Sequence, residues 1–283
     1  MNEAAALHAI QSALAEDLGA TGDVTTLALV DPAAVAEGRV LTREACVVAG
    51  AEVGRLTLQT VDPSVECEIL APDGATLAPN DALLRFRGRA ASILAAERVL
   101  LNFMQRLCGI ATLTRSFVDA VAGTRAVILD TRKTTPNLRV FEKHAVRCGG
   151  GQNHRFGLFD RVLMKDNHRR LWRDGDAARL DLAVAAARKK FPGLEVEIEV
   201  ETLDELQSAL AGKPEWILLD NMSTALMREC VAVNAGRAKL EASGGITLGR
   251  AREVAETGVD AISLGCLTHS ARAVDLTLEW DIA

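Results

Sequence analysis

The sequence contains no run of 18 apolar residues, so we predict neither a membrane-spanning helix nor a membrane partner. Residues 1–19 lack a basic stretch followed by an apolar one. They show an amphipathic helical pattern through Leu7, Ile10 and Leu14, so we expect no secretion signal. None of the six cysteines forms a CxxC pair, and no histidine–cysteine spacing fits zinc. Scattered cysteines without an export signal predict reduced thiols in a cytoplasmic protein.

The chain also lacks an excess of positive charge. Its 32 Lys and Arg stand against 38 Asp and Glu, a formal net charge of -6. General nucleic-acid binding usually needs a basic domain, so we expect no nucleic-acid partner. Residues 130–170 are the exception, because ten Lys and Arg against four Asp and Glu make this segment +6 and leave -12 for the rest. A local cationic cluster on an acidic protein predicts a pocket for a small, multiply charged anion.

Low-complexity segments, repeats and long linkers are absent as well, but two parts of the chain differ in pattern. Residues 1–115 begin with a helical pattern, continue with short strand-like runs between turn signals, and end with a long helical pattern. This order is typical of an α+β sandwich domain with an antiparallel sheet. The tail, residues 271–283, alternates like a strand, and we expect it to return to this first domain.

Residues 116–270 alternate between apolar strand candidates and helical patterns. Such alternation predicts parallel strands joined by right-handed crossovers. Six units are few for an eight-stranded barrel, so we expect an incomplete βα barrel, with an open doubly wound sheet as the alternative. The expected strands cover residues 126–129, 161–164, 196–200, 216–219, 239–242 and 261–264. The expected helices cover residues 181–191, 203–211, 224–235 and 248–257.

Each expected strand of this second domain ends in a polar residue or a glycine. In a βα barrel the functional groups lie at the carboxyl ends of the strands and in the loops that follow. Loops are polar in any protein, so one such ending carries no weight, whereas six in series favour a functional site. The six residues in chain order are Asp130, Lys165, Glu201, Asp220, Ser243 and Gly265.

Residues 195–201 alternate strictly between glutamate and an aliphatic residue. A period of two places all four glutamates on one face of a strand. If that face is the barrel interior, the glutamates need cationic partners, and Lys165, Arg132 and Lys133 are the obvious ones. The alternative is an edge strand with a solvated acidic face. Membership of the βα series favours the interior.

Two further segments supply groups that bind anions. Thr131, Arg132 and Lys133 follow a buried strand, and their hydroxyl and cationic groups suit carboxylate or phosphate oxygens. Residues 149–151 are three glycines that let the backbone approach a ligand, and His154 and Arg155 follow them directly. The combination predicts a binding site, although three glycines alone are common in plain loops.

A phosphate site is predicted at two other loops. Ser243, Gly244 and Gly245 precede a helix, and the run Leu264–Cys266 ends the strand after it. Paired loops of this kind hold phosphate through backbone N–H groups and a helix N-terminus. Before both loops in the chain, Asp220 ends an apolar strand and could hold a ribose hydroxyl or a Mg²⁺ ion that the substrate's phosphates carry.

Eight segments, in order along nearly the whole chain, resemble the quinolinate phosphoribosyltransferase family, also called nicotinate-nucleotide pyrophosphorylases (carboxylating). They are EDLGATGDVTT (16–26), ERVLLNFMQRLCGIAT (97–112), DTRKTTPNLR (130–139), KHAVRCGGGQNHRFGLFDRVLMKDNH (143–168), EVEIEVETLDE (195–205), LLDNM (218–222), EASGGI (241–246) and GVDAISLGCLTHS (258–270). The resemblance implies a type II phosphoribosyltransferase-like fold, an N-terminal sandwich domain followed by an incomplete barrel. It also implies at least a homodimer, in which one subunit's first domain covers the partner's barrel.

The resemblance further implies transfer of phosphoribosyl from phosphoribosyl pyrophosphate to quinolinate with decarboxylation, in NAD biosynthesis, with substrate-associated Mg²⁺ and no organic cofactor. Residues take roles by the segments they match. Arg132, His154, Arg155 and Lys165 would bind quinolinate together with Arg98 of the partner subunit, Lys133 would lie between substrate and pyrophosphate, Glu199 or Glu201 and Asp220 would face the ribose and metal, and Ser243, Gly244, Gly245, Leu264, Gly265 and Cys266 would hold the 5′-phosphate.

Three other functions stay open at this point. The first is a related barrel phosphoribosyltransferase with another acceptor, such as the molybdenum-operon homologue. The second is a Schiff-base aldolase with Lys165 or Lys133 as nucleophile, which needs a lysine of lowered pKa. The third is a phosphometabolite-binding protein without activity. The signature of the other structural class of phosphoribosyltransferases, two acids and a glycine-rich loop, is absent, because residues 218–224 contain one acid and no glycine.

Overall fold

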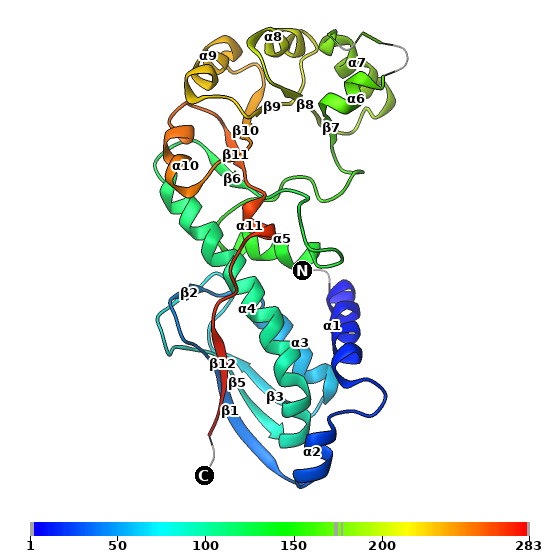
Figure 1. Cartoon of the computed structure of the whole chain (residues 1–283), viewed down its shortest axis with the longest axis vertical. Coiled ribbons are helices and arrows are strands. Elements are labelled where there is room, and N and C mark those ends of the chain that lie inside the picture. Colours follow the sequence, from blue (N-terminus) through cyan, green and yellow to red (C-terminus); the bar gives the residue numbers. More distant parts are fainter. Residues whose placement is uncertain (1–2, 173–174, 177, 282–283) are drawn as a thin grey trace. The chain divides into compact units, whose positions relative to one another are not determined.

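A computed structural model describes residues 3–172, 175–176 and 178–281 (Figure 1). Its contacts divide the chain into two compact units. The first comprises residues 1–115, 133–150 and 266–283, and the second comprises residues 116–132 and 151–265. The sequence predicted a single boundary before the tail, which gives domains 1–115 and 116–270. That these two segments are separate folding domains stays a prediction. None of the helices in the described ranges combines the length and the apolar composition that crossing a membrane requires.

The first unit contains an antiparallel sheet with one buried face. Its strands are ordered β12 (Leu276–Trp280), β1 (Val35–Thr42), β5 (Ala82–Arg89) and β3 (Glu66–Ile69). The tail therefore does return, since β12 pairs with β1. Side chains from the sheet, α3 (Ala51–Val61) and α4 (Ala90–Ala120) form one core, in which Phe86, Leu58 and Leu100 are almost fully buried. Side chains along β5 alternate between the two faces of the sheet, which directs Leu84 and Phe86 into this core.

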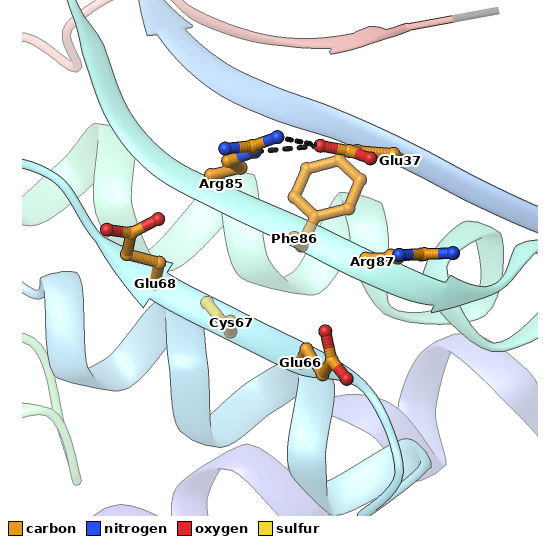
Figure 2. A pocket seen from close by; sticks show the side chains of 7 residues that line it. All are labelled: Glu37, Glu66, Cys67, Glu68, Arg85, Phe86 and Arg87. Carbon is orange, nitrogen blue, oxygen red and sulfur yellow. Dashed lines mark hydrogen bonds and ion pairs between the residues drawn. The ribbon is translucent and has the colours of Figure 1, made fainter.

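The other face of this sheet is charged. Arg85 donates to Glu37 on the neighbouring strand, with 2.8 Å between Nε and Oε1. Figure 2 shows these side chains beside Glu66, Glu68 and Arg87, which line an open hollow of about 340 Å³. Opposite charges that alternate across strands stabilise an exposed sheet face modestly. The mostly charged lining is unlike the apolar wall of a typical small-molecule pocket.

The remaining elements of the first unit are short, apart from the N-terminal helix. They are α1 (Glu3–Leu18), α2 (Val24–Leu29), β2 (Cys46–Val47), β4 (Thr76–Leu77), α5 (Arg139–Cys148) and α11 (Cys266–His269). Sequence patterns did not predict α5. Its buried Glu142 accepts a hydrogen bond from Arg106, with 2.9 Å between Nη2 and Oε1, and another from the backbone N–H of Thr135 at 3.0 Å. Glu142 thereby fixes the loop that begins with Lys133 and leads into α5.

The second unit is built on six parallel strands. In sheet order they are β6 (Val127–Leu129), β11 (Ala261–Ser263), β10 (Lys239–Ser243), β9 (Trp216–Asp220), β8 (Val196–Val200) and β7 (Val162–Met164). From β7 to β11 the spatial order follows the chain, and β6 lies next to β11. This is the cyclic order of a barrel that stays open between β6 and β7. The prediction of an incomplete barrel is thus confirmed, and the doubly wound alternative, whose strand order reverses at a switch point, is wrong.

Helices connect most of these strands. They are α6 (Asp166–Arg170), α7 (Leu180–Lys190), α8 (Leu203–Ala211), α9 (Thr224–Asn234) and α10 (Leu248–Ala255). Side-chain caps set two of the boundaries. The hydroxyl of Thr202 accepts from the backbone N–H of Glu205 at the start of α8, and that of Ser223 accepts from Leu226 at the start of α9. The expected helices in this region agree with the observed ones within two residues at either end.

Strand β8 is buried along its full length. Glu197 and Glu199 therefore lie inside the barrel, as the alternating pattern predicted. The same expectation was wrong for Glu195 and Glu201, which flank the strand and are exposed. A five-residue strand places only its middle acids in the interior, and those at its two ends reach solvent.

Candidate active site

An ion pair connects the ends of β7 and β8. Lys165 follows β7, and its ammonium contacts Oε2 of Glu199. The carboxylate side is buried, with 8% of the Glu199 side chain exposed, whereas 46% of the Lys165 side chain is exposed. Glu201 is exposed and lies past the end of the strand. Of the two candidate acids, Glu199 is the one held beside a predicted substrate-binding lysine.

Arg132 and Arg155 add positive charge in the same unit. Both are half-buried. Burial, and after it the charge of Arg132, lowers the pKa of Arg155. The Arg155 guanidinium also donates to the carbonyl oxygen of Arg161, with 3.2 Å between Nη1 and O. Two like charges held close together at reduced exposure are stabilised when an anion binds between them.

The carboxylate of Asp130, at the end of β6, holds the segment that carries His154. Its Oδ1 accepts from the backbone N–H of His154 at 2.8 Å, and its Oδ2 accepts from the side-chain amide of Asn153 at 2.6 Å. The backbone N–H of Arg155 donates to Nδ1 of His154 at 2.6 Å. Because Nδ1 accepts a hydrogen bond, the imidazole proton resides on Nε2. Asp130 therefore determines the orientation of both His154 and the residue that follows it.

The ring of His154 points into the barrel. Its Nε2 lies 3.1 Å from Oε2 of Glu197 and 3.5 Å from Oε2 of Glu241, and 7% of the residue is exposed. Glu197 also pairs with Arg161, with 3.3 Å between Nη1 and Oε2. With its donor directed at the glutamates, His154 would have to turn to contact quinolinate, as predicted for it. In the present arrangement it supports the wall of the site.

The two buried glutamates hold their protons differently. Burial, followed by the charge of Glu197, raises the pKa of Glu241 well above its ordinary value. Burial would also raise the pKa of Glu197, but the hydrogen bond from His154 and the charge and hydrogen bond of Arg161 outweigh it and lower that pKa. Glu197 is thus the ionised member and Glu241 the protonated one. Neither Glu241 nor Arg161 was a predicted site residue, although Glu241 begins the EASGG segment.

The ends of β9 and β10 form a tight glycine loop. Ser243 is in register with Asp220, and its carbonyl oxygen accepts from the backbone N–H of Asn221 at 3.0 Å. Asn221 also donates its amide to Oδ2 of Asp220 at 2.8 Å. Gly244 has φ +99°, and a β-carbon there would lie 2.2 Å from Oδ1 of Asn221. Only glycine fits this position.

Gly245 lies in a different environment from Gly244. Its φ is +57°, and a β-carbon added to it would meet no atom within 4 Å. The loop therefore exposes its backbone to open space just before α10, whose N-cap is Thr247. Strand β11 lies beside β10, so Leu264 and Gly265 follow the neighbouring strand. This is the arrangement expected of paired phosphate loops.

The other predicted site residues are divided between the two units. Thr131 belongs to the second unit and is half-buried, whereas Arg98 and Lys133 belong to the first unit and are exposed. The carbonyl oxygen of Lys133 accepts from the hydroxyl of Thr268 at 2.7 Å. Cys266 begins α11, in the first unit. The second unit brings together Lys165 with Glu199, Arg132 with Arg155, and Asp220 with Ser243 and Gly244.

Comparisons with known proteins agree with the two-part architecture. The family described as "Quinolinate phosphoribosyl transferase, N-terminal domain" matches residues 23–108, and the one described as "Quinolinate phosphoribosyl transferase, C-terminal domain" matches residues 110–279. A nicotinate-nucleotide pyrophosphorylase (carboxylating) from Mycobacterium leprae (strain TN) is 42% identical over 280 residues, which cover 97% of each chain.

Solved structures give the same result. The structure of the nicotinate-nucleotide pyrophosphorylase from Francisella tularensis is similar with a TM-score of 0.92 at 36% identity, and the match covers 99% of this chain and 98% of that one. The corresponding protein from Ehrlichia chaffeensis has a TM-score of 0.90 at 37% identity, with 97% and 98% of the two chains covered.

Proposed function

The chain belongs to the quinolinate phosphoribosyltransferase family, and we propose on that premise that it transfers phosphoribosyl from phosphoribosyl pyrophosphate to quinolinate. The products are nicotinate mononucleotide, pyrophosphate and CO₂, a step of NAD biosynthesis. The proposal rests on the charge of Arg132 acting on Arg155 and on a glycine loop with open space at Gly245, which follows β10 at the same carboxyl edge of the parallel sheet at which Arg132 follows β6. A dicarboxylate and a phosphate ester are the anions that these two features suit.

Quinolinate fits the cationic side of the site. Arg132 and Arg155 can each hold a planar carboxylate by two parallel N–H···O bonds. Lys165, steadied by Glu199, offers a further positive charge. Holding both carboxylates orients the pyridine nitrogen toward the ribose carbon that it attacks, which is the main effect that positioning contributes.

The acids fit the ribose side. As the bond from C1 to pyrophosphate breaks, positive charge develops on the ribose, and nearby carboxylates stabilise that charge. Asp220 and Glu199 are the acids in suitable positions, at the ends of β9 and β8. The exposed Glu201 is less suited. Lys133 would neutralise the departing pyrophosphate.

Magnesium fits as a substrate-bound ion. In the described part of the chain, two groups of three potential ligands lie close enough together to hold an ion, and neither includes Glu199 or Asp220. Glu199 is already neutralised by Lys165, whereas Asp220 is half-buried beside a neutral amide. Asp220 therefore suits an ion that takes most of its oxygen ligands from pyrophosphate and water. When bound, the ion would stabilise the leaving group's charge.

Loss of CO₂ needs no organic cofactor. After the ring nitrogen bonds to C1 it is cationic, and the electron pair left at the neighbouring carbon by the departing carboxylate is stabilised by that charge. The carbon then takes a proton. The product's own ring thus serves as the electron sink that a cofactor supplies in other decarboxylases.

A Schiff-base aldolase fits the geometry less well. Its nucleophile must be a neutral, desolvated lysine. The side chain of Lys165 is 46% exposed and pairs with the carboxylate of Glu199, and Lys133 is exposed, so neither lysine is desolvated. A related barrel phosphoribosyltransferase with another acceptor is separated from the present proposal by assaying acceptors side by side.

A cytoplasmic homodimer with a shared site completes the proposal. All six cysteines are free thiols, which suits a reducing compartment. Leu27 and Leu29 on α2 are 71% and 80% exposed, an apolar surface of the kind that subunit contacts cover. The exposed Arg98 would then complete the partner's site. If so, impaired Arg98→Ala and Arg132→Ala variants should regain activity when mixed under conditions that exchange subunits, and mixtures no more active than the separate variants would contradict a shared site.

The central experiment supplies quinolinate, phosphoribosyl pyrophosphate and Mg²⁺ to the purified protein. We expect nicotinate mononucleotide and CO₂ in equal amounts, with omission of any one component abolishing both. Nicotinate in place of quinolinate serves as the acceptor control, because it lacks the second carboxylate that Arg132 and Arg155 are proposed to hold. Equal turnover of both acceptors, or release of CO₂ without the nucleotide, would contradict the proposal.

A further inference from the structure

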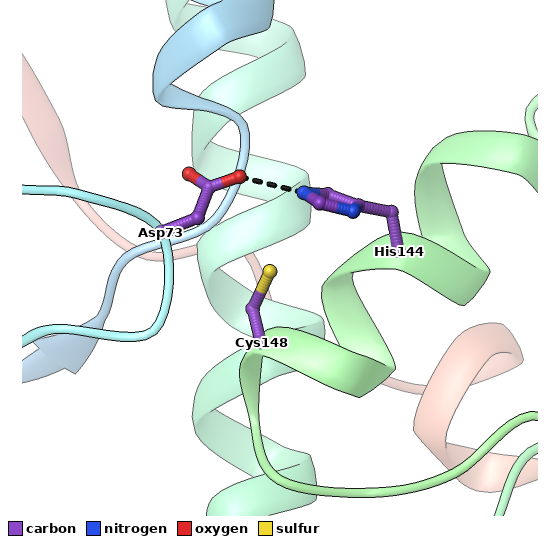
Figure 3. Close-up of side chains that lie close together, drawn as sticks. All are labelled: Asp73, His144 and Cys148. Carbon is purple, nitrogen blue, oxygen red and sulfur yellow. Dashed lines mark hydrogen bonds and ion pairs between the residues drawn. The ribbon is translucent and has the colours of Figure 1, made fainter. Parts of the chain in front are cut away.

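Three side chains with metal-binding donors meet in the first unit (Figure 3). Asp73 lies in the turn between β3 and β4, and His144 and Cys148 lie on α5. One donor atom from each, a carboxylate oxygen, a ring nitrogen and the sulfur, lies within 4.8 Å of the other two. The spacing of four residues places His144 and Cys148 on one face of the helix.

We propose that Asp73, His144 and Cys148 form a binding site for a divalent transition-metal ion, with Zn²⁺ as the ion that the donor set suits best. Imidazole, thiolate and carboxylate together are typical ligands of zinc, whereas Mg²⁺ and Ca²⁺ take oxygen ligands. Three protein ligands leave a fourth tetrahedral position for water. This proposal does not depend on the reaction proposed above.

The donor atoms of Asp73 and His144 can reach the spacing that zinc requires by a small movement. Nε2 of His144 lies 2.6 Å from Oδ2 of Asp73, at hydrogen-bond distance. Tetrahedral ligands at about 2.0 Å from zinc would lie roughly 3.3 Å apart. The two donor atoms must therefore separate by about 0.7 Å to bind the ion. Both side chains are partly exposed, His144 by 20% and Asp73 by 23%. The exposure also leaves the ion a path to the site.

Neighbouring contacts leave the required donor atoms available. The other oxygen of Asp73, Oδ1, accepts from the backbone N–H of Ala51 at 2.9 Å, which fixes the carboxylate while Oδ2 faces the imidazole. Nδ1 of His144 is buried and has no hydrogen-bond partner in the described part of the chain. Moving the ring proton from Nε2 to Nδ1, which metal binding at Nε2 requires, therefore breaks no second hydrogen bond.

The thiol of Cys148 has a raised pKa. Burial, and after it the charge of Asp73, raises the pKa of Cys148 to about 12, although Arg147 acts in the opposite direction. Without a metal the thiol is protonated and therefore unreactive.

A bound ion would connect α5 to the turn before β4. In the chain, α5 is flanked by residues 130–136 and 149–155, the two loops that carry Arg132 and Arg155. Fixing the helix that joins them would restrict both loops. We therefore expect Zn²⁺ to raise the melting temperature of the protein without being required for turnover.

Cobalt titration of the metal-free full-length protein tests the site. Co²⁺ replaces zinc and gives a thiolate-to-cobalt charge-transfer absorption in the near ultraviolet. We expect this absorption at one Co²⁺ per chain and its loss when Zn²⁺ is added. Cys148→Ser should abolish it, whereas Cys67→Ser should not, because Cys67 is a half-buried thiol of raised pKa in the same unit that belongs to no such ligand group.

A second pair of variants covers the case in which Cys148→Ser fails to fold. Asp73→Asn should keep the charge-transfer absorption but weaken Co²⁺ binding at least tenfold, and His144→Ala should weaken it by at least as much. Absence of the absorption in the unsubstituted protein would overturn the proposal. So would an absorption that survives Cys148→Ser, or an affinity that neither of the other two variants changes.

Discussion

Oε2 of Glu241 lies 3.5 Å from Nε2 of His154, in the interior of the barrel. Glu197 faces the same nitrogen at 3.1 Å and pairs with Arg161 as well. Burial and the charge of Glu197 raise the pKa of Glu241, so the barrel holds one carboxylate and one carboxylic acid around a single imidazole. The acid is neutral because its environment cannot stabilise a second negative charge.

Replacing Glu241 by glutamine should therefore make the folded protein more stable. A carboxyl group whose folded-state pKa is raised contributes stability below its unfolded-state pKa, and this contribution is lost as the pH rises, because the unfolded chain releases its proton and the folded chain keeps it. The loss is at most about 1.4 kcal/mol per pH unit. We expect Glu241→Gln to match the unsubstituted protein below about pH 4, where a glutamate in the unfolded chain is protonated as well, and to be increasingly more stable from there toward about pH 8.

Urea unfolding at several pH values measures this difference. Glu229→Gln is the matched control, because Glu229 is exposed on the outer helix α9 and should leave the pH profile unchanged. If Glu241→Gln also gives the profile of the unsubstituted protein, Glu241 is ionised in the folded state and the assignment is incorrect.

Replacing Lys165 by alanine should impair catalysis more than folding. The substitution leaves the buried carboxylate of Glu199 without its cation and removes a proposed contact to quinolinate. We expect kcat/KM to fall at least a hundredfold, roughly 2.7 kcal/mol. Lys165→Arg should recover part of the loss, because it restores the charge but not the shape.

Lys239 provides the control for Lys165. It lies at the start of β10, at the amino end of another strand of the same barrel, with Nζ 4.8 Å from the centre of the Trp216 ring. Lys239→Ala should leave kcat/KM within about twofold of the unsubstituted enzyme, since functional groups lie at the carboxyl ends of barrel strands. Equal losses for the two lysines would indicate a general effect on the barrel instead.

The sequence alone predicted the strand ends well because they depend on local pattern. Parallel strands with alternating helices place Asp220 and Ser243 at one edge of the sheet whatever the details of packing. Local pattern could not predict which acid lies beside Lys165. Period two assigns Glu199 and Glu201 to one face, and only the observed end of β8 shows that Glu199 is buried and Glu201 is not.

Long-range contacts explain what sequence patterns missed. Helix α5 lies within a strongly cationic segment, and those charges suggested a binding loop. No helix was therefore predicted there, although Phe141, Ala145 and Val146 supply it with a buried apolar side. The association of His154 with Glu241 joins residues 87 positions apart, which no local spacing predicts. The metal-ligand group of Asp73, His144 and Cys148 combines a helical spacing of four with a turn from a distant part of the chain.

Arg132 should determine affinity for the acceptor. Arg132→Ala removes one of the two guanidinium groups proposed to hold the carboxylates, so we expect either a higher KM for quinolinate or a kcat/KM lowered at least tenfold, roughly 1.4 kcal/mol. Arg188→Ala is the control, because Arg188 pairs with Glu215 and lies on the outer helix α7. Steady-state kinetics with each substrate varied in turn separates a higher KM from a lower kcat/KM. Unchanged kinetics for Arg132→Ala would remove Arg132 from the site.

Alanine at Gly244 and at Gly245 should separate folding from phosphate binding. At Gly244 a β-carbon would collide with the side chain of Asn221, and φ is +99°, so we expect Gly244→Ala to destabilise the second unit by several kcal/mol. At Gly245 the β-carbon meets no protein atom, and the left-handed backbone costs only about 1–2 kcal/mol. The new methyl group would instead enter the space proposed for the 5′-phosphate. Gly245→Ala should therefore remain folded in urea titrations yet raise the KM for phosphoribosyl pyrophosphate at least tenfold, with less effect on the KM for quinolinate. An unchanged KM for phosphoribosyl pyrophosphate in this variant would show that the phosphate does not bind at this loop.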